Sequence, residues 1–393
     1  MTMATRLRPA LLAAAVTSCL LATAAPPASA QHYVAFGDSI TEGEGDDESR
    51  PEEELGYPPR LQSLLRDNGQ PEAVVVNRGV GGENTAEGMS RINEVLDEED
   101  GDVLLLMEGT NDITNRLSRE TTTFNLGEMA RRAENRGYQV VHATLIPRIP
   151  AANVDSENVL NQNLNQEIRD LAGRSGRRLV DNFYVFGALP DVFATHYWTN
   201  PIDRVGHPNA TGYDEMADAF LDVLTGTDSV PPVPGLISPE HGAVRVPAGS
   251  EVRIDLWDFG AGVDVANTSL TVDGDEVEAQ ITGAGDRAQI FFTSAEPLSG
   301  VVTVGLSTRD LATPANAFEG DVARFVIAGT TFLPGDIDLS GRVDGADLVE
   351  FGRAFGAVQG TGRYNARADL DEDGDVDGED LAMLAANFGR SSG

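Results

Sequence analysis

Continuous apolar runs separated by helical patterns are the feature that most limits how residues 31 to about 225 can fold. Val103–Met107 is apolar throughout, and residues 139–146 repeat this character, as expected for strands that are covered on both faces. Between such runs apolar residues recur at helical spacing, for example at Leu160 and Leu164. Strands that alternate with helices predict a parallel sheet with helices on both faces. We therefore expect an α/β domain in this part of the chain.

Composition limits the number of domains and the kinds of partner. A chain of 393 residues is too long for one ordinary domain and suggests two or three. Hydrophobic residues make up 41% of it, which is enough for packed cores. The formal net charge is −35, and every basic residue is an arginine. Such an acidic surface argues against nucleic acid and anionic membranes as partners.

The N-terminal segment, residues 1–30, has the features of a secretory signal peptide. Two arginines precede an apolar run, residues 10–21, and residues 28–30 offer a small-residue cleavage site. The run is too short and too rich in alanine for a membrane-spanning helix. An alternative is that residues 16–19 form a bacterial lipobox, which would leave Cys19 lipidated. The sequence thus predicts a secreted or cell-surface bacterial protein, with lipid anchoring at Cys19 as the minor alternative.

Three stretches place polar side chains or glycines just after predicted strands. Ser39 follows a short apolar run and Gly37, so it is either the N-cap of the next helix or a nucleophile at the sheet edge. Gly82 ends a glycine-rich turn whose N–H groups could face a developing oxyanion. A dinucleotide-binding motif is excluded there, because Asn84 stands where the third glycine would be. Asn111 offers an amide donor at the same edge, although asparagine is also a common turn residue.

A fourth stretch precedes the last helix of the α/β region. His207 is followed by Pro208, which fixes the turn, and Asp203 lies four residues upstream. An imidazole with an adjacent acid is what a serine needs for activation, since a hydroxyl alone is a poor nucleophile. The chain has no G-x-S-x-G motif, which excludes the nucleophile elbow of the α/β-hydrolases.

Taken together, residues 31 to about 225 resemble the SGNH (GDSL-type) hydrolase family. The resemblance implies a three-layer α/β/α fold and serine esterase chemistry without a catalytic cofactor. It implies that Ser39 is the nucleophile and His207 the base. The N–H groups of Ser39 and Gly82 and the Asn111 amide would form the oxyanion hole.

The sequence departs from the family pattern at the position of the catalytic acid. In the family the acid lies three residues before the histidine, and this position is Arg204 here. Asp203 would need a one-residue bulge at Gly206 to reach the imidazole of His207. Some relatives work with a Ser–His pair, so the alternative is that Asp203 only caps a turn.

Beyond residue 225 the pattern changes to short alternating strands. Residues 229–235 are rich in proline and predict a stiff linker. Alternating apolar residues around Ile254 and Val304, with a hairpin signal at Asp273–Gly274, then predict a small β-sandwich over residues 236–330. This region resembles a bacterial Ig-like module, and a spacer is favoured over a sugar-binding module.

The C-terminal region contains the one internal repeat of the chain, two acidic loops with matching spacing. Oxygen ligands at loop positions 1, 3, 5, 9 and 12, a backbone carbonyl at 7 and glycine at 6 suit seven-coordinate calcium. The alternative, a merely solvated acidic tail, does not explain two matched copies. The predicted ligands are Asp336, Asp338, Ser340, Arg342, Asp344 and Asp347 in the first loop, and Asp369, Asp371, Asp373, Asp375, Asp377 and Asp380 in the second.

Each acidic loop leads into a helical pattern, while no helix precedes it. Residues 334–390 therefore look like paired half EF-hands and resemble a type I dockerin domain with two structural calcium ions. That family docks on a cohesin through loop positions 10 and 11. These positions hold Gly345–Ala346 and Gly378–Glu379 rather than the usual hydroxyl pair, so calcium binding is better supported than a particular partner.

Two classes of function remain. The first is a secreted esterase that acts on ester-decorated polysaccharide, with a lipolytic or aryl esterase as the alternative within the class. The second is a cell-surface adhesion or scaffold protein with an inactive hydrolase domain, against which the intact set of Ser39, Gly82, Asn111 and His207 argues. The expected domains are a signal peptide (1–30), a hydrolase domain (31–228), a linker (229–235), an Ig-like sandwich (236–330) and a dockerin-like domain (334–390).

Overall fold

The structure is a computed structural model of the chain. It describes residues 31–47, 55–148, 155–189, 192–199, 205–329, 333–337, 341–359 and 364–391. The predicted signal peptide and Cys19 lie outside these ranges. None of the helices in the described ranges combines the length and the apolar character that a membrane crossing requires.

A five-stranded sheet forms the centre of the first domain, with the strand order β2-β1-β3-β4-β5. Every neighbouring pair is parallel. The β3 strand is buried at each of its five positions, which confirms the prediction from its apolar run. The strands are β1 (His32–Gly37), β2 (Val74–Gly79), β3 (Val103–Met107), β4 (Gln139–Ala143) and β5 (Arg178–Val180).

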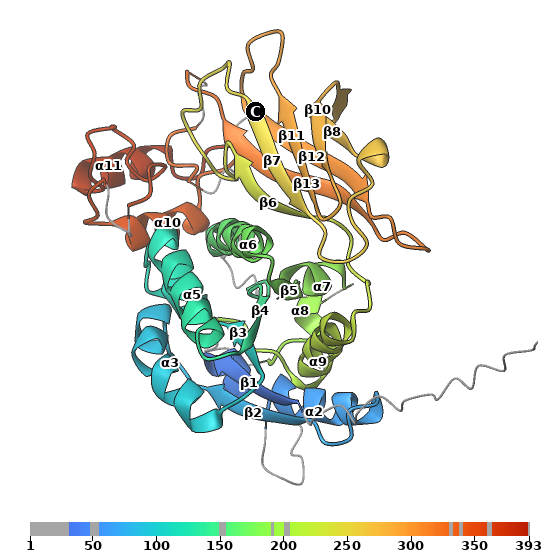
Figure 1. The fold of residues 1–393 in the computed structure, drawn as a ribbon. Helices are drawn as coiled ribbons and strands as arrows, with labels where there is room; N and C mark the ends of the chain where they lie inside the picture. Colours follow the sequence, from blue (N-terminus) through green and yellow to red (C-terminus); the bar gives the residue numbers. More distant parts are fainter. Residues whose placement is uncertain are drawn as a thin grey trace, which may run out of the picture.

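Helices cover both faces of this sheet, so the predicted three-layer α/β/α architecture is confirmed (Figure 1). One layer holds α3 (Thr85–Glu99), α5 (Arg119–Glu134) and α6 (Asp155–Ser175). The other holds α2 (Tyr57–Asp67) and α9 (Ala210–Thr225). Shorter helices connect the layers: α1 (Ser39–Glu42), α4 (Thr110–Thr114), α7 (Asn182–Ala188) and α8 (Val192–Thr195).

Local sequence signals explain where the main helices begin and how they pack. Asn84 caps α3 and forms a capping box with Glu87, as its type and spacing predict. The stacked rings of Tyr57 and Phe220, 4.6 Å apart, join α2 to α9 beneath the sheet. Gly226 ends α9 with φ of 78°, a conformation that glycine adopts without strain.

Two antiparallel four-stranded sheets follow, with the orders β10-β11-β7-β6 and β13-β12-β8-β9. Their inner faces share one apolar core that includes Ile254, Val304 and Phe325. The predicted hairpin lies between β8 and β9, where Asp273 (φ 53°) and Gly274 (φ 87°) make the turn. The strands are β6 (Val233–Ser238), β7 (Val252–Trp257), β8 (Ser269–Val272), β9 (Asp275–Val277), β10 (Gln280–Ala284), β11 (Arg287–Phe292), β12 (Val301–Arg309) and β13 (Ala317–Val326), with a short 3-10 helix at Val265–Asn267.

The linker predicted at residues 229–235 is shorter than expected, because its last residues belong to β6. Val233 and Pro234 pair with β7, and the register shifts before Ile237. Proline is tolerated there because β6 is an edge strand and the pairing is irregular. The proline-rich composition was therefore misleading at this point.

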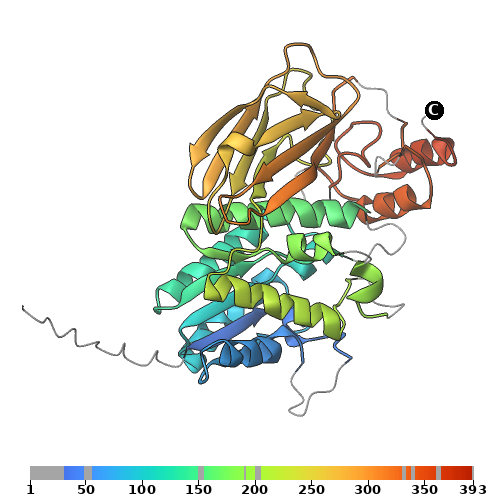
Figure 2. The same cartoon turned by 90° about the vertical axis from the view of Figure 1, so that its right-hand side faces the viewer.

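The sandwich packs directly on α6 of the first domain (Figures 1 and 2). A Cβ on Gly173 would lie 2.4 Å from the Trp257 ring, so the glycine allows the indole to pack on the helix. The Trp257 indole N–H donates to Asp170 Oδ1 (3.3 Å), and Arg169 Nη1 donates to the Pro234 carbonyl (3.2 Å). The two domains thus form one packed unit around α6.

The C-terminal region consists of two short helices around a small core. These helices are α10 (Gly345–Ala354) and α11 (Gly378–Asn387). Each begins three residues before the first leucine of its apolar pattern, since capping boxes start them at Asp344 and Asp377. Figure 1 shows them beside the sandwich, with α10 near the start of α5.

Candidate active site

Ser39 lies just beyond the carboxyl end of β1, in the first turn of α1. The Asp38 side chain caps this turn and accepts the Ile40 N–H at 3.0 Å. Ser39 Oγ is hydrogen-bonded to His207 Nε2 at 2.8 Å. The two residues lie 168 positions apart in the sequence, so only the tertiary fold brings them together.

His207 is held by backbone pairing between two loops. The Trp198 N–H donates to the His207 carbonyl at 2.9 Å, and Tyr197 forms a β-bridge with Pro208. The imidazole is mostly buried, with 6% of the residue exposed. The backbone pairing of the loop that precedes α9 therefore holds the imidazole so that it faces Ser39.

Glycine is required at the turn between β1 and α1. A Cβ on Gly37 would lie 2.1 Å from the Met107 carbonyl oxygen and 2.3 Å from Thr41 Oγ1. Both contacts belong to regular structure, β3 and α1, which cannot shift without breaking hydrogen bonds. A side chain at position 37 would therefore displace Ser39.

Gly82 and Asn111 lie at the ends of the strands on either side of β1. Gly82 has φ of 78°, and a Cβ there would meet nothing within 4 Å, so the backbone at this turn faces open space. The Asn111 amide Nδ2 donates to the Glu83 carbonyl at 2.8 Å, which ties the two loops together. The sheet order therefore brings the predicted Gly82 and Asn111 to the same edge as Ser39.

Two supporting interactions were not foreseen from the sequence. Asp112 accepts the Thr85 N–H at 2.9 Å and the Thr122 hydroxyl at 2.9 Å, and so holds the start of α3 against the Asn111 loop. Arg91 pairs with the Glu83 carboxylate at 2.5 Å and donates to the Arg78 carbonyl. From the sequence, Asp112 could have been suspected because it is the neighbour of Asn111. Nothing in the sequence points to a role for Arg91.

Glu44 is a further residue that sequence reasoning missed. Its Oε2 lies 3.4 Å from His207 Nε2, the nitrogen that also faces Ser39 Oγ. The side chain is about half exposed (51%), and its own N–H donates to the Ser39 carbonyl at 3.0 Å. No periodicity or motif in the sequence singles this glutamate out.

The predicted acid, Asp203, lies outside the described residues. Gly206, at the position where a bulge was expected, has φ of 88°, in the left-handed region that glycine favours. The assignment of Asp203 therefore stays a prediction.

Comparison with known proteins identifies two of the regions. Residues 35–215 match the GDSL-like lipase/acylhydrolase family, and residues 334–388 match the type I dockerin domain. The chain carries a GDSL hydrolase domain and a type I dockerin domain. These matches confirm the resemblances to the SGNH (GDSL-type) hydrolases and to the type I dockerins, while the resemblance of residues 236–330 to an Ig-like module stays a prediction.

Individual relatives match only parts of the chain. An arylesterase from Vibrio mimicus is 30% identical over 88 residues, which is 22% of this chain and 44% of the arylesterase, so less than half of that relative is spanned. A lipase/acylhydrolase structure from Enterococcus faecalis is 20% identical, with a TM-score of 0.43, over 50% of this chain and 96% of its own. An acetylxylan esterase structure from Geobacillus stearothermophilus is 20% identical, with a TM-score of 0.41, over 49% of this chain and 94% of its own.

Burial changes the acidity of Asp38 in the GDSL domain. Its side chain is 1% exposed, and burial raises the pKa of the carboxyl from 3.8 to about 6, although the Ile40 N–H partly offsets this. The folded chain thus binds this proton more readily than the unfolded chain. The contribution to stability is fully present below pH 3.8 and is lost as the pH rises through about 6.

We expect Asp38→Asn to stabilise the GDSL domain above neutral pH. Asparagine is an equally good N-cap but carries no charge to bury, so the gain should reach up to about 3 kcal/mol at pH 8 and vanish near pH 3. Thermal unfolding at several pH values measures this difference. The exposed Asp67→Asn is the matched control and should show no such pH-dependent gain. An equal pH dependence in wild type and Asp38→Asn would contradict the expectation.

The dockerin domain contains loops whose donors fit calcium. Asp369, Asp371 and Asp373 each place an oxygen within 4.8 Å of the others. The glycine at position 6 of each loop, Gly341 or Gly374, has φ of 82° or 97°, as the sharp turn of a calcium loop requires. Type I dockerin domains typically bind calcium, and this acidic cluster fits that property.

The two loops are built alike. Asp336 accepts the Gly341 N–H at 3.0 Å, and Asp369 accepts the Gly374 N–H at 3.1 Å. At position 12, Asp347 and Asp380 are buried and accept N–H groups from their own loops.

The remaining predicted ligands fall into three groups. Asp344 and Asp377 cap the helices, while the backbones of Arg342 and Asp375 form isolated bridges to Ser391 and Val358. Asp338 and Ser340 lie outside the described residues.

Proposed function

We propose that the GDSL domain is a serine ester hydrolase that works through an acyl-enzyme. The observation that carries this proposal is the 2.8 Å hydrogen bond between Ser39 Oγ and His207 Nε2 at the carboxyl edge of the sheet. A serine hydroxyl becomes an effective nucleophile when an adjacent imidazole accepts its proton. The glycine turn and the buried amide beside the pair support the same chemistry.

The proposed reaction has two stages. Ser39 Oγ attacks the ester carbonyl while His207 Nε2 takes the hydroxyl proton, and the N–H groups of Ser39 and Gly82 and the Asn111 amide stabilise the oxyanion. The proton then passes from His207 to the leaving alcohol. Water, activated by the same imidazole, next attacks the acyl-enzyme and releases the acid.

Asp203 is proposed to orient His207 as the third member of the triad. Asp203→Ala should then lower kcat by roughly two to four decades, because the imidazolium that forms would lose its partner. Activity should rise with pH as the His207 imidazole loses its proton, because only the neutral imidazole can accept the proton of the Ser39 hydroxyl. Measuring kcat against pH for wild type and variant checks both statements. A loss below about tenfold with an unmoved profile would remove Asp203 from the catalytic set.

The proposed substrate is an ester-substituted polysaccharide outside the cell. Dockerin-bearing proteins are typically extracellular or at the cell surface, where such domains bind cohesins. The leader-like residues 1–30 support the same location. We propose two structural calcium ions in the dockerin domain and a cohesin-type partner for it. The partial match to an arylesterase keeps small aryl esters as the alternative substrate class.

One substrate panel tests the proposal. Wild type and Ser39→Ala are assayed on acetylated xylan and on short-chain and long-chain p-nitrophenyl esters. Acetate release from xylan by wild type alone supports the polysaccharide esterase. Turnover of only the short or only the long p-nitrophenyl esters would favour an aryl or lipolytic esterase. No Ser39-dependent turnover on any substrate would overturn the proposed hydrolase and favour an inactive scaffold.

A further inference from the structure

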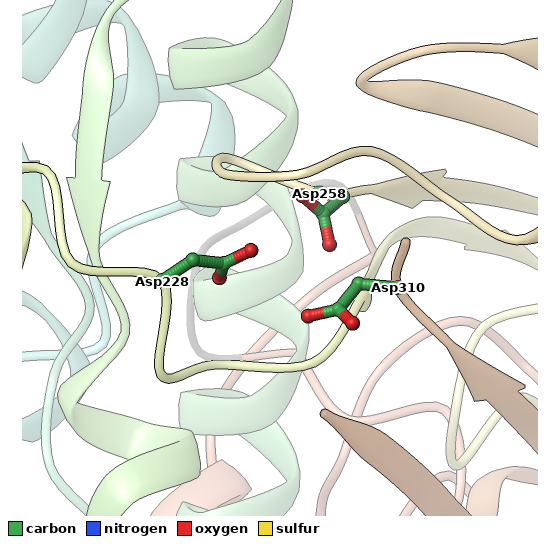
Figure 3. Close-up of side chains that lie close together, drawn as sticks. All are labelled: Asp228, Asp258 and Asp310. Atoms are coloured by element: carbon green, nitrogen blue, oxygen red, sulfur yellow. The ribbon is translucent and has the colours of Figure 1, made fainter. Parts of the chain in front are cut away.

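Three aspartates from separate parts of the chain converge where the GDSL domain meets the sandwich. Asp228 follows α9, Asp258 follows β7 and Asp310 follows β12. One carboxylate oxygen of each lies within 4.8 Å of the others. Figure 3 shows the three side chains pointing toward one another from three different loops.

Asp258 has an oxygen that no neighbour satisfies. Its Oδ1 accepts the N–H groups of Gly260 and Gly262, each at 2.8 Å, which fixes the carboxylate in place. The residue is only 2% exposed, and within the described part of the chain its Oδ2 has no hydrogen-bond partner. A buried carboxylate oxygen without a partner is costly, so a ligand is expected beside it.

The other two carboxylates are also held by their surroundings. Asp310 Oδ1 accepts the Asn316 N–H at 2.8 Å, and Asn316 Nδ2 donates to Asp310 Oδ2 at 2.6 Å and to the Asp228 carbonyl at 3.2 Å. Asp228 Oδ2 accepts the Ala261 N–H at 2.8 Å. A Cβ on Gly260 would lie 2.3 Å from Asp228 Cγ, so this glycine permits the close approach of the two loops.

No ion pair offsets the negative charge of this cluster in the described part of the chain, unlike the charges of the buried Asp181 and Asp255. Asp181 pairs with Arg169 at 2.6 Å, and Asp255 pairs with Arg287 at 3.2 Å. Among the described residues, no arginine or histidine forms an ion pair with the cluster.

We propose that Asp228, Asp258 and Asp310 bind one calcium ion that fastens the sandwich to the GDSL domain. The donors are all oxygens, which suit a hard cation. Two ligands on opposite sides of calcium are about 4.8 Å apart, since each bond is about 2.4 Å long, and the three carboxylates stay within that limit. A cavity of about 480 Å³ is lined in part by Asp228 and Gly260, beside the cluster.

The positions of the ligands define what the ion would do. Asp258 follows β7 of one sheet, Asp310 follows β12 of the other sheet, and Asp228 lies in the segment that leaves α9. The ion therefore joins both sheets of the sandwich to the end of the GDSL domain. It is separate from the dockerin loops and binds through none of their residues.

Counting bound calcium in the full-length chain tests the site. Wild type, Asp258→Asn and the control Asp275→Asn, an exposed aspartate of the same sandwich, are dialysed against calcium and analysed for metal content. Asp258→Asn should hold one ion fewer than wild type, and Asp275→Asn the same number. Asp228→Asn should also hold one ion fewer. Because Asp228 lies outside the sandwich core, this variant shows whether a loss in Asp258→Asn reflects a missing ligand or a misfolded sandwich. Equal counts in wild type, Asp258→Asn and Asp228→Asn would overturn the proposal.

Limited proteolysis separates this ion from those of the dockerin domain. Chelation should speed cleavage of wild type within residues 226–232 several-fold, because Asp228 loses its anchor. Asp228→Asn should be cleaved at the fast rate with or without calcium. Asp369→Asn, in a dockerin loop, should keep the calcium protection of this segment. Cleavage that is unchanged by chelation in wild type would contradict a fastening role.

Discussion

Replacing Ser39 by alanine is expected to lower ester hydrolysis by at least about four decades while leaving the GDSL domain folded. The hydroxyl supplies the covalent step, and no neighbouring group replaces it once the bond to His207 is lost. Alanine removes a single oxygen from a small side chain in the first turn of α1, where it is a good helix former. Turnover of the best ester of the panel and the melting temperature are the two measurements.

Ser90→Ala provides the matched control for this substitution. Ser90 is a helical serine of α3 whose hydroxyl donates only to the Ala86 carbonyl of its own helix. Its replacement should change neither turnover nor melting by a measurable amount. Near-wild-type turnover in Ser39→Ala would end the acyl-enzyme interpretation, whatever the control shows.

Replacing Asn111 by alanine is expected to lower kcat by about 10²–10³, the loss seen when one oxyanion donor is removed. The side chain is held beside the glycine turn by its hydrogen bond to the Glu83 carbonyl, so its position does not depend on substrate. The donor acts on charge that develops in the transition state, and KM should therefore change little.

Asn115→Ala separates this effect from a change in the loop. Asn115 is an exposed residue at the end of α4, the short helix that also contains Asn111. Its loss should leave kcat within about twofold of wild type, whereas both variants can lose some stability. A kcat in Asn111→Ala within tenfold of wild type would show that the backbone N–H groups suffice for the oxyanion.

The sequence predicted the structure correctly where residues close together in the chain determine the local conformation. The apolar run Val103–Met107 specifies a doubly covered strand, and Asn84 with Glu87 specifies the start of α3, because burial pattern and capping are local. The repeated acidic loops could be read for the same reason, since calcium ligands follow one another along a single segment. Residues 233–235 were predicted as linker but begin β6, because edge-strand pairing with β7 is a property of the sheet.

Long-range contacts were decided by the tertiary structure alone. The sequence offered Ser39 and His207 as candidates, but the strand order and the loop before α9 determine that they meet at 2.8 Å. Glu44 reaches the same imidazole without any signal in the sequence. Asp228, Asp258 and Asp310 look like ordinary loop aspartates along the chain. They become a buried cluster of like charge only because the packing of the sandwich on α6 brings three distant loops together.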